Sequence, residues 1–193
     1  MPHKTYQLHP VEFAEYIVGC FIQVNDCSGR IVEAEAYTDT PEDYSSHAHT
    51  RKKSAGEIMN TAGIIYVYSI HAGLATNITT DPENTGAVLI RAIEPLQGIE
   101  QMIHRRSRSG SKISKTWQRD DMTTLRSLTD GPSKLSEALG IQKEWNNTPV
   151  DEHLLLLDKT EQPVIASSSR IGISSSRDLP WRFYDRNSPF VSR

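Results

Sequence analysis

Cysteine and long apolar runs are scarce in this chain of 193 residues, and their scarcity excludes several classes of protein. The two cysteines, Cys20 and Cys27, are too few for a disulfide framework and do not form a CxxC pair, so we expect both to be reduced. No apolar run approaches the roughly 20 residues that span a bilayer. The first ten residues also lack the basic start and apolar core of a secretory signal. We therefore expect a globular protein of the cytosol with no membrane partner.

Nucleotide-binding and hydrolase signatures are absent as well. The chain has no GxGxxG, Walker or GxSxG motif, which disfavours nucleotide cofactors and serine-hydrolase chemistry. It has no internal repeat and no linker that would separate two units. Its 193 residues fit the usual range of roughly 100–200 residues for one domain. We predict a single domain over residues 1–193.

Basic residues are slightly outnumbered, but they are unevenly distributed. The 21 lysines and arginines against 24 acidic residues give a net charge of −3, which by itself argues against a nucleic-acid partner. Residues 101–119, however, contain six cations and no acidic residue, namely Arg105, Arg106, Arg108, Lys112, Lys115 and Arg119. A basic segment on a mildly acidic body can follow a phosphate backbone, because the local field matters more than the total. An ordinary solvated loop is the alternative.

The remaining pattern predicts a mixture of helices and strands. Pro10 can begin a helix that Gly19 ends, and helical spacing follows Pro95. Another helix fits residues 132–139, closed by Gly140. Strands are expected at residues 20–25, 30–37, 63–71, 86–93 and 171–173, with the first two forming a hairpin around a turn at residues 26–29. Residues 38–62 show no clear period, and a loop of that length is usually functional or disordered.

The segment IVEAEAY has an unusual pattern for a strand. Alternation places Glu33, Glu35 and Tyr37 on one face. A carboxylate held against an aromatic surface is partly desolvated, which raises its pKa and makes it a plausible general base. The alternative is a solvent-facing strand that carries two ordinary glutamates.

Histidine and tyrosine pairs offer two further candidates. His47 and His49 could bind a metal, but no carboxylate or cysteine stands near them at a recognised ligand spacing. Tyr66 and Tyr68 share one face of a predicted strand. Paired tyrosines usually pack in a core, although a protein that handles bases needs aromatic faces for stacking.

Two cations also stand in informative places. Arg91 lies within an apolar strand, where an arginine is costly unless it pairs with a carboxylate or phosphate. Lys134 follows the GPS sequence that begins a predicted helix, whose free amide groups could bind a phosphate. Simple capping of that helix is the alternative.

Several segments, taken together and in order, resemble a known family. They are IVEAEAY, PED, His47, GIIYVYSI, Asn77-Ile78, VLIRAIEPL, GPSKL, RIGI and RFYDRNSPFVS. This ordered set resembles the alkyladenine (3-methyladenine) DNA glycosylase family from about residue 10 to residue 192. The resemblance implies an α+β fold, in which a single mixed domain has a curved antiparallel β-sheet surrounded by helices and long loops.

The resemblance also implies roles for individual residues. Glu35 would activate the water that attacks the sugar, and Arg91 would help to orient that water. The pocket for the flipped base would be formed by Tyr37, His47, Tyr68, Asn77 and Leu89. Family members insert a tyrosine into the duplex, and the matching stretch here is one residue shorter and has His71 at that position. The basic segment and the GPSK helix start, independently of the resemblance, predict that Arg105, Arg106, Arg108 and Lys134 contact the DNA backbone.

The implied activity is that of a monofunctional DNA glycosylase in base excision repair. It would flip and hydrolytically excise 3-methyladenine, 7-methylguanine, hypoxanthine or ethenoadenine from damaged double-stranded DNA. It would work as a monomer, without a cofactor, a metal or an obligate protein partner, in the bacterial cytoplasm at the nucleoid or in a eukaryotic nucleus. The rival interpretations are a catalytically weak module that binds DNA lesions and a metal hydrolase that uses His47 and His49.

Overall fold

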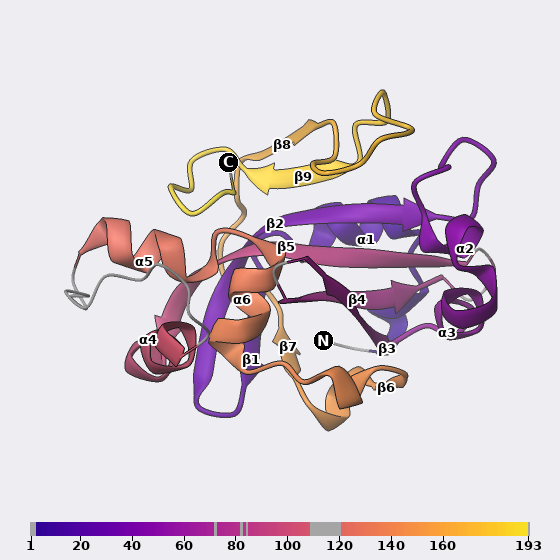
Figure 1. The fold of residues 1–193 in the computed structure, drawn as a ribbon. Coiled ribbons are helices and arrows are strands. Elements are labelled where there is room, and N and C mark those ends of the chain that lie inside the picture. The colour runs from indigo at the N-terminus through magenta and orange to yellow at the C-terminus, as the bar shows by residue number, and fades with distance from the viewer. Residues whose placement is uncertain (1–2, 72, 82, 84, 109–120, 193) are drawn as a thin grey trace.

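The computed structural model describes residues 3–71, 73–81, 83, 85–108 and 121–192. Within them, nine strands form one curled antiparallel sheet, and helices lie around it (Figure 1). The mixed α+β class expected from the sequence is therefore confirmed. Nowhere in these described ranges is a helix long and apolar enough to cross a membrane.

The sheet has a central path of seven strands in the order β6-β3-β4-β5-β2-β1-β7, and β9 pairs with both β2 and β8. The strands are β1 (Phe21–Val24), β2 (Cys27–Thr38), β3 (Ile64–Ile70), β4 (Gly73–Thr80), β5 (Gly86–Gln97), β6 (Thr148–Pro149), β7 (Leu155–Leu157), β8 (Ile165–Ser168) and β9 (Arg182–Asp185).

Each helix in the described residues has fewer residues than β2 or β5. They are η1 (His3–Gln7), α1 (Pro10–Ile17), α2 (His47–Thr50), the π-helical η2 (Lys52–Gly56), α3 (Glu57–Met59), α4 (Ile99–Arg108), α5 (Met122–Thr129), α6 (Pro132–Leu139), η3 (Lys143–Trp145) and η4 (Val150–Glu152). In Figure 1, α2 and α3 lie at one end of the sheet, and α4 and α5 lie at the other.

The expected hairpin at the start of the sheet is present, but its turn lies earlier than predicted. Val24 pairs with Cys27, so residues 25 and 26 form the turn and β2 already begins at Cys27. Asn25 has a φ of 51°, and asparagine is among the few residues that adopt this left-handed conformation readily. The two-residue turn makes β2 twelve residues long.

Strand β5 is also longer than predicted. It continues to Gln97, because residues 93–97 pair with the extended first half of β2. Gly98, with a φ of 70°, ends the strand, and α4 begins at Ile99. We expected a helix directly after Pro95, and this prediction is wrong for Leu96. That residue still belongs to β5, and it is 45% exposed.

One face of the sheet forms the main core. The buried side chains on this face come from β2, β3, β4 and β5, and they are Ala34, Ala36, Ile65, Val67, Ile78, Val88 and Ile90. Helix α1 packs against them with Phe13, Ala14 and Ile17, as Pro10 and the apolar spacing predicted. Because alternation sends odd and even residues to opposite faces, the remaining residues of these strands lie on the other side.

The prediction of a strand at residues 171–173 is wrong. The C-terminal strands are instead β8 and β9, which form an antiparallel pair, and β9 pairs with Glu33–Glu35 of β2. Residues 171–173 lie in the connection between β8 and β9. The backbone N–H of Ile171 donates to a Glu35 carboxylate oxygen at 2.7 Å, so a side chain takes the place of a strand partner.

Helix α6 has the bounds predicted for it, and α4 is attached to it by two arginines. Gly140 closes α6 with a left-handed φ of 77°. Arg106 is buried and forms an ion pair with Glu137 of α6. Arg105 donates to the Ala138 carbonyl oxygen at 2.9 Å.

The predicted DNA-backbone role is therefore wrong for Arg106, because its guanidinium lies inside the protein between two helices. Arg105 is half-buried at the same junction, whereas Arg108 is exposed. The other cations of the basic segment, Lys112, Lys115 and Arg119, lie outside the described residues.

We predict that Arg106→Met lowers the free energy of unfolding by about 2–4 kcal/mol, because it leaves a partly buried carboxylate without its guanidinium. Arg108→Met, two residues further along the same helix, removes an exposed charge and should change stability by less than about 0.5 kcal/mol. Urea denaturation of the wild type and of the two variants measures both changes in the free energy of unfolding. Equal stabilities for the two variants would contradict the structural role of Arg106.

Candidate active site

The register of the sheet places four side chains in one row on the face opposite α1. Glu35 of β2 pairs with Leu89 of β5, Leu89 with Asn77 of β4, and Asn77 with Tyr66 of β3. Directly paired residues point to the same side of an antiparallel sheet. Residues far apart in the sequence therefore meet in one line across four strands.

Three more predicted residues lie one pleat away from this row. Tyr37 and Arg91 follow Glu35 and Leu89 by two positions on their strands, and Tyr68 follows Tyr66 by two. A spacing of two returns to the same face. Alternation and register together thus place most of the predicted site on one surface.

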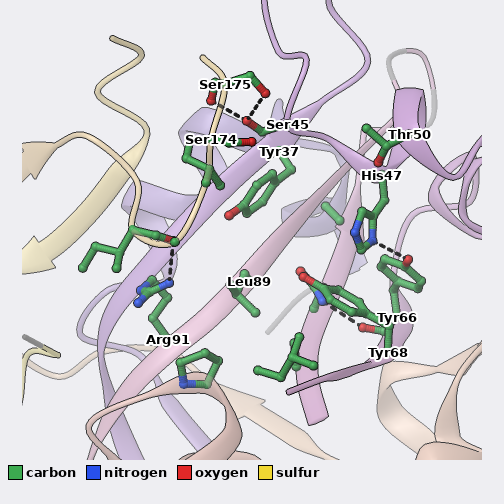
Figure 2. A pocket seen from close by; sticks show the side chains of 18 of the residues that line it. Tyr37, Ser45, His47, Thr50, Tyr66, Tyr68, Leu89, Arg91, Ser174 and Ser175 are labelled. Atoms are coloured by element: carbon green, nitrogen blue, oxygen red, sulfur yellow. Dashed lines mark hydrogen bonds between the residues drawn. The ribbon is translucent and has the colours of Figure 1, made fainter. Parts of the chain in front are cut away.

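This surface forms a cavity of about 560 Å³ (Figure 2). Every predicted pocket residue lines it, namely Tyr37, His47, Tyr68, Asn77 and Leu89, and so do Arg91 and His71. Such a volume lies within the usual range of small-ligand sites. Glu35 is not among the lining residues, since it lies behind the wall that Tyr37, Arg91 and Ile171 form.

One wall of the cavity is aromatic. The rings of His47 and Tyr68 lie 4.4 Å apart, and those of Tyr66 and Tyr68 lie 5.2 Å apart. His47 Nδ1 and the Tyr66 hydroxyl are 2.7 Å apart, which fixes the imidazole against the strand. Burial, and after it the positive charge of Arg51, lowers the pKa of His47 to about 4. The imidazole is therefore neutral at pH 7.

The two loop histidines do not form a metal site with each other. His47 contacts the Tyr66 hydroxyl, whereas Nε2 of the exposed His49 lies 3.0 Å from the Thr40 carbonyl oxygen. In the ranges that the structure describes, no three histidine, cysteine or carboxylate side chains gather as metal ligands. The donor set for the metal-hydrolase interpretation is missing from this part of the chain.

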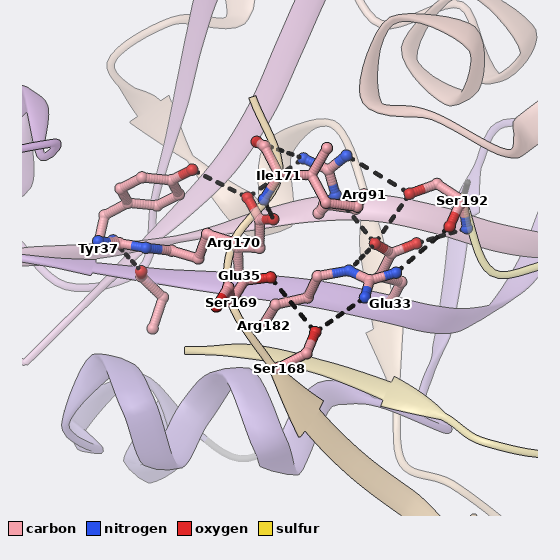
Figure 3. A network of polar contacts seen from close by, with 11 residues as sticks. Glu33, Glu35, Tyr37, Arg91, Ser168, Ser169, Arg170, Ile171, Arg182 and Ser192 are labelled. Atoms are coloured by element: carbon pink, nitrogen blue, oxygen red, sulfur yellow. Dashed lines mark hydrogen bonds and ion pairs between the residues drawn. The ribbon is translucent and has the colours of Figure 1, made fainter. Parts of the chain in front are cut away.

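The carboxylate of Glu35 has no exposed surface and is held by three donors (Figure 3). Oε2 accepts from the Tyr37 hydroxyl at 2.9 Å and from Arg91 Nη1 at 3.2 Å, and Oε1 accepts from the Ile171 amide at 2.7 Å. Burial raises the pKa of Glu35, and these three donors oppose that rise without cancelling it. The solvent-facing alternative for this strand is thus excluded.

Glu33 has a different environment, although it lies only one pleat away. Its carboxylate accepts from Arg91 Nε at 3.0 Å, from Arg182 Nε at 2.6 Å, and from the amide and hydroxyl of Ser192 at 2.6 and 2.9 Å. Three of these donors bind Oε1 and the Ser192 amide binds Oε2, and two of the four are guanidinium groups. Glu33 therefore anchors Arg91, and it is not among the residues that line the cavity.

A second buried ion pair supports Tyr37 from behind. Arg170 Nη2 lies 2.6 Å from Asp43 Oδ1, and neither side chain has exposed surface. The guanidinium lies 4.6 Å from the centre of the Tyr37 ring and 5.4 Å from that of Trp181. The PED segment that carries Asp43 thus fixes an aromatic wall of the cavity.

The rim of the cavity comes from two loops whose role the sequence did not reveal. Ser45 donates to the Ser175 carbonyl oxygen at 2.5 Å, and the Tyr44 amide donates to the Ser176 hydroxyl at 2.9 Å. The partners are about 130 residues apart, and neither loop has a periodic pattern. Short serine-rich segments carry no signal for such a contact.

The remaining predicted residues have three different environments. Asn77 is buried, and its amide donates to the Tyr66 carbonyl oxygen at 3.0 Å. His71 is exposed in the turn between β3 and β4, so the alternative that β3 continues and buries it is excluded. Lys134 lies in the first turn of α6 and donates to Asp130 at 2.7 Å. The preceding Pro132 lines the cavity.

Comparison with known proteins places the chain among DNA glycosylases. A family model described as methylpurine-DNA glycosylase (MPG) matches residues 4–189. A protein of Chlorobium luteolum is 41% identical over 86% of this chain and 80% of its own length. Proteins of Nitrosospira multiformis and Bacillus licheniformis are 36% and 34% identical over the whole chain and over 93% and 96% of their own lengths. All three are named "Putative 3-methyladenine DNA glycosylase".

The raised pKa of Glu35 predicts a specific dependence of stability on pH. The unfolded carboxyl ionises near its usual value of 4.5, whereas the folded carboxyl ionises at higher pH. Between these two values the folded state holds the extra proton, so folding is disfavoured progressively as the pH rises. The loss amounts to about 1.4 kcal/mol for each pH unit between the two pKa values.

Glu35→Gln removes this titration. Urea denaturation from pH 4.5 to pH 8 should show wild type losing stability relative to Glu35→Gln and then levelling off. Glu161→Gln removes an exposed carboxyl and should follow the wild-type curve. Parallel curves for wild type and Glu35→Gln would show that the pKa of Glu35 is not raised.

Proposed function

The chain belongs to the methylpurine-DNA glycosylase family, and from that membership we propose that it excises alkylated or deaminated purines from duplex DNA by hydrolysis. The substrates in this proposal are 3-methyladenine, 7-methylguanine, hypoxanthine and ethenoadenine, and the product begins base excision repair. The observation that carries the proposal is a carboxylate with a raised pKa behind a cavity with aromatic walls.

Glu35 is the proposed general base. Oε1 accepts from the Ile171 amide, and a carboxylate oxygen can accept a second hydrogen bond, here from a water molecule. Arg91 would hold this water on the cavity side, where its guanidinium is part of the lining. Burial raises the pKa of Glu35, and a carboxylate with a higher pKa is a stronger base toward the proton of a bound water.

The proposed reaction is a displacement by water. The water oxygen bonds to the sugar C1′, and the bond between C1′ and the purine nitrogen breaks. Its electron pair leaves with the purine, and the water proton passes to Glu35. A cationic purine departs as a neutral base, so little acid assistance is needed. A neutral purine such as hypoxanthine departs as an anion and takes a proton from solvent water. The negative charge of Glu35 would also stabilise positive charge that develops on the sugar.

A hydrolytic route is favoured over a lyase route by the composition of the cavity. A lyase needs an amine that forms a Schiff base with the sugar. Among the described residues that line the cavity there is no lysine. We therefore propose a monofunctional glycosylase that leaves an abasic site.

The walls would select the flipped base. Tyr37 on one side and His47 and Tyr68 on the other would stack on a purine, and stacking is worth about 1–3 kcal/mol per base. Asn77 would exclude guanine, since its side chain lines the cavity and would clash with a 2-amino group placed against it. Arg108, which is exposed at the end of α4, and Lys134, whose side chain is partly exposed near the cavity-lining Pro132, are the proposed backbone contacts.

We expect Glu35→Gln to bind lesion-containing duplex normally and to lose excision. The amide is nearly isosteric with the carboxyl but cannot take a proton from water, and loss of a general base typically lowers the rate about 10²–10⁴-fold. Single-turnover release of 3-methyladenine or hypoxanthine, followed by alkaline cleavage at abasic sites, measures this rate. Gel shift of the same duplex measures binding.

Glu161→Gln, which removes an exposed carboxyl, is the matched control and should keep the wild-type rate. A wild-type rate in Glu35→Gln would remove Glu35 from the role of base. Wild-type protein that binds the lesion but releases no base would favour the alternative of a lesion-binding module.

We propose that His71 fills the gap left by the flipped nucleotide, because it is exposed in the β3–β4 turn and lines the cavity. His71→Ala should lower excision from duplex by about 5–150-fold if a full stacking contact of about 1–3 kcal/mol is lost. Excision from single-stranded DNA, which has no gap to fill, should change little. His71→Tyr should restore the duplex rate. Equal losses on duplex and single strand would exclude His71 as the wedge.

A further inference from the structure

A guanidinium lies on the aromatic wall at a place that the proposed chemistry does not use. The Cζ of Arg51 lies 5.5 Å from the centre of the Tyr68 ring. Arg51 caps the C-terminal end of α2, and its side chain is exposed. Tyr68 lines the cavity, whereas Arg51 is absent from the described lining residues. The cation therefore lies over a ring of the cavity wall without lining the cavity itself.

The other titratable groups on this wall are uncharged at neutral pH. His47, 4.4 Å from Tyr68, has a pKa of about 4, and burial raises the pKa of both Tyr66 and Tyr68. The charge of Arg51 reaches these groups, because it lowers the pKa of His47. On the opposite wall, the guanidinium of Arg170 is neutralised by Asp43. Arg91, whose charge also reaches Tyr68, is paired with Glu33 and Glu35. Arg51 thus contributes positive potential to the Tyr66–Tyr68–His47 wall from a position where no carboxylate of the described residues forms an ion pair with it.

An aromatic ring attracts a cation through the negative potential of its faces. A guanidinium on one face makes the other face less attractive to a second cation, and the two like charges also repel each other. A neutral base has no net charge, so the guanidinium weakens its stacking much less. The position of Arg51 should therefore affect how well the cavity binds a cationic base relative to a neutral one.

We propose that Arg51 sets the preference of the cavity between cationic and neutral purines, by disfavouring cationic bases such as 7-methylguanine relative to neutral ones such as hypoxanthine. This inference rests on the proposed function, because it concerns the same cavity. Arg51 acts through Tyr68 and is a specificity-determining residue, not a catalytic one.

The expected effect follows from the distances. A base stacked about 4.5 Å beyond the ring would lie about 10 Å from the guanidinium. Two unit charges at that separation, with an effective dielectric constant of about 35, change a ratio of rates roughly five-fold. Because Arg51 is exposed, the effect should weaken as ionic strength rises.

The test compares two duplexes of the same sequence, with 7-methylguanine or hypoxanthine at the same position. For Arg51→Gln, the ratio of kcat/KM for 7-methylguanine to that for hypoxanthine should rise about five-fold. Arg51→Lys keeps the charge and should keep the wild-type ratio within two-fold. Lys53→Gln, which removes a charge exposed on the neighbouring η2, should lower both values equally and leave the ratio unchanged. Any phosphate contact made by Arg51 affects both duplexes alike and cancels in the ratio.

A second measurement is independent of activity. Titration of His47 followed by NMR should show a higher pKa in Arg51→Gln than in wild type, because one cause of its lowered pKa has been removed.

An unchanged ratio in Arg51→Gln would overturn the inference, and so would an equal rise in Lys53→Gln. Both results presuppose that wild type excises the two lesions. Absence of excision by wild type would instead refute the proposed function, so the two failures are distinguishable.

Discussion

Two carboxylates with no exposed surface, Glu33 and Glu35, lie on one face of the central strand β2. Residues from several distant segments supply the ion pairs and hydrogen bonds that these buried charges need. A buried charge needs opposite charge and hydrogen bonds, since its loss of solvation costs several kcal/mol. Arg91 on β5 bridges both carboxylates, and Arg182 and Ser192 complete the shell around Glu33. This requirement explains why β9 and the C-terminal residues fold over β2 although they are about 150 residues away.

Another buried carboxylate, next to this network, is also neutralised by an arginine. Asp43 and Arg170 form a second buried pair, and the guanidinium lies against the ring of Tyr37. The hydroxyl of that tyrosine donates to Glu35. The aromatic wall and the carboxylate are therefore coupled, because one side chain belongs to both. Movement of either loop that holds the ion pair would alter the stacking surface and the hydrogen bonding of Glu35 together.

Local patterns predicted the parts of the site that depend on neighbours in sequence. Alternation placed Glu33 and Glu35 on one face of a strand, and the start and end signals of α6 gave its bounds. Contacts between distant segments could not be predicted in this way. Arg106 sits in a basic segment typical of DNA contacts, but its partner Glu137 is 31 residues away on another helix. Strand β4 was missed because its threonines and glycine give no apolar alternation. Ile171 looked like part of a strand, yet its amide binds a carboxylate.

The Ile171 contact also links the energetics of the fold to its proposed chemistry. An ionised Glu35 is disfavoured by burial, and the Ile171 amide is one of the donors that reduce this cost. The same residue lines the cavity, and its carbonyl oxygen lies 3.5 Å from Arg91 Nη1. In the proposed reaction, a water molecule on the cavity side of Glu35 would lie beside both residues, whose donors and acceptor would orient it. The loop that reduces the cost of burying the charge is thus also part of the cavity wall next to the proposed base.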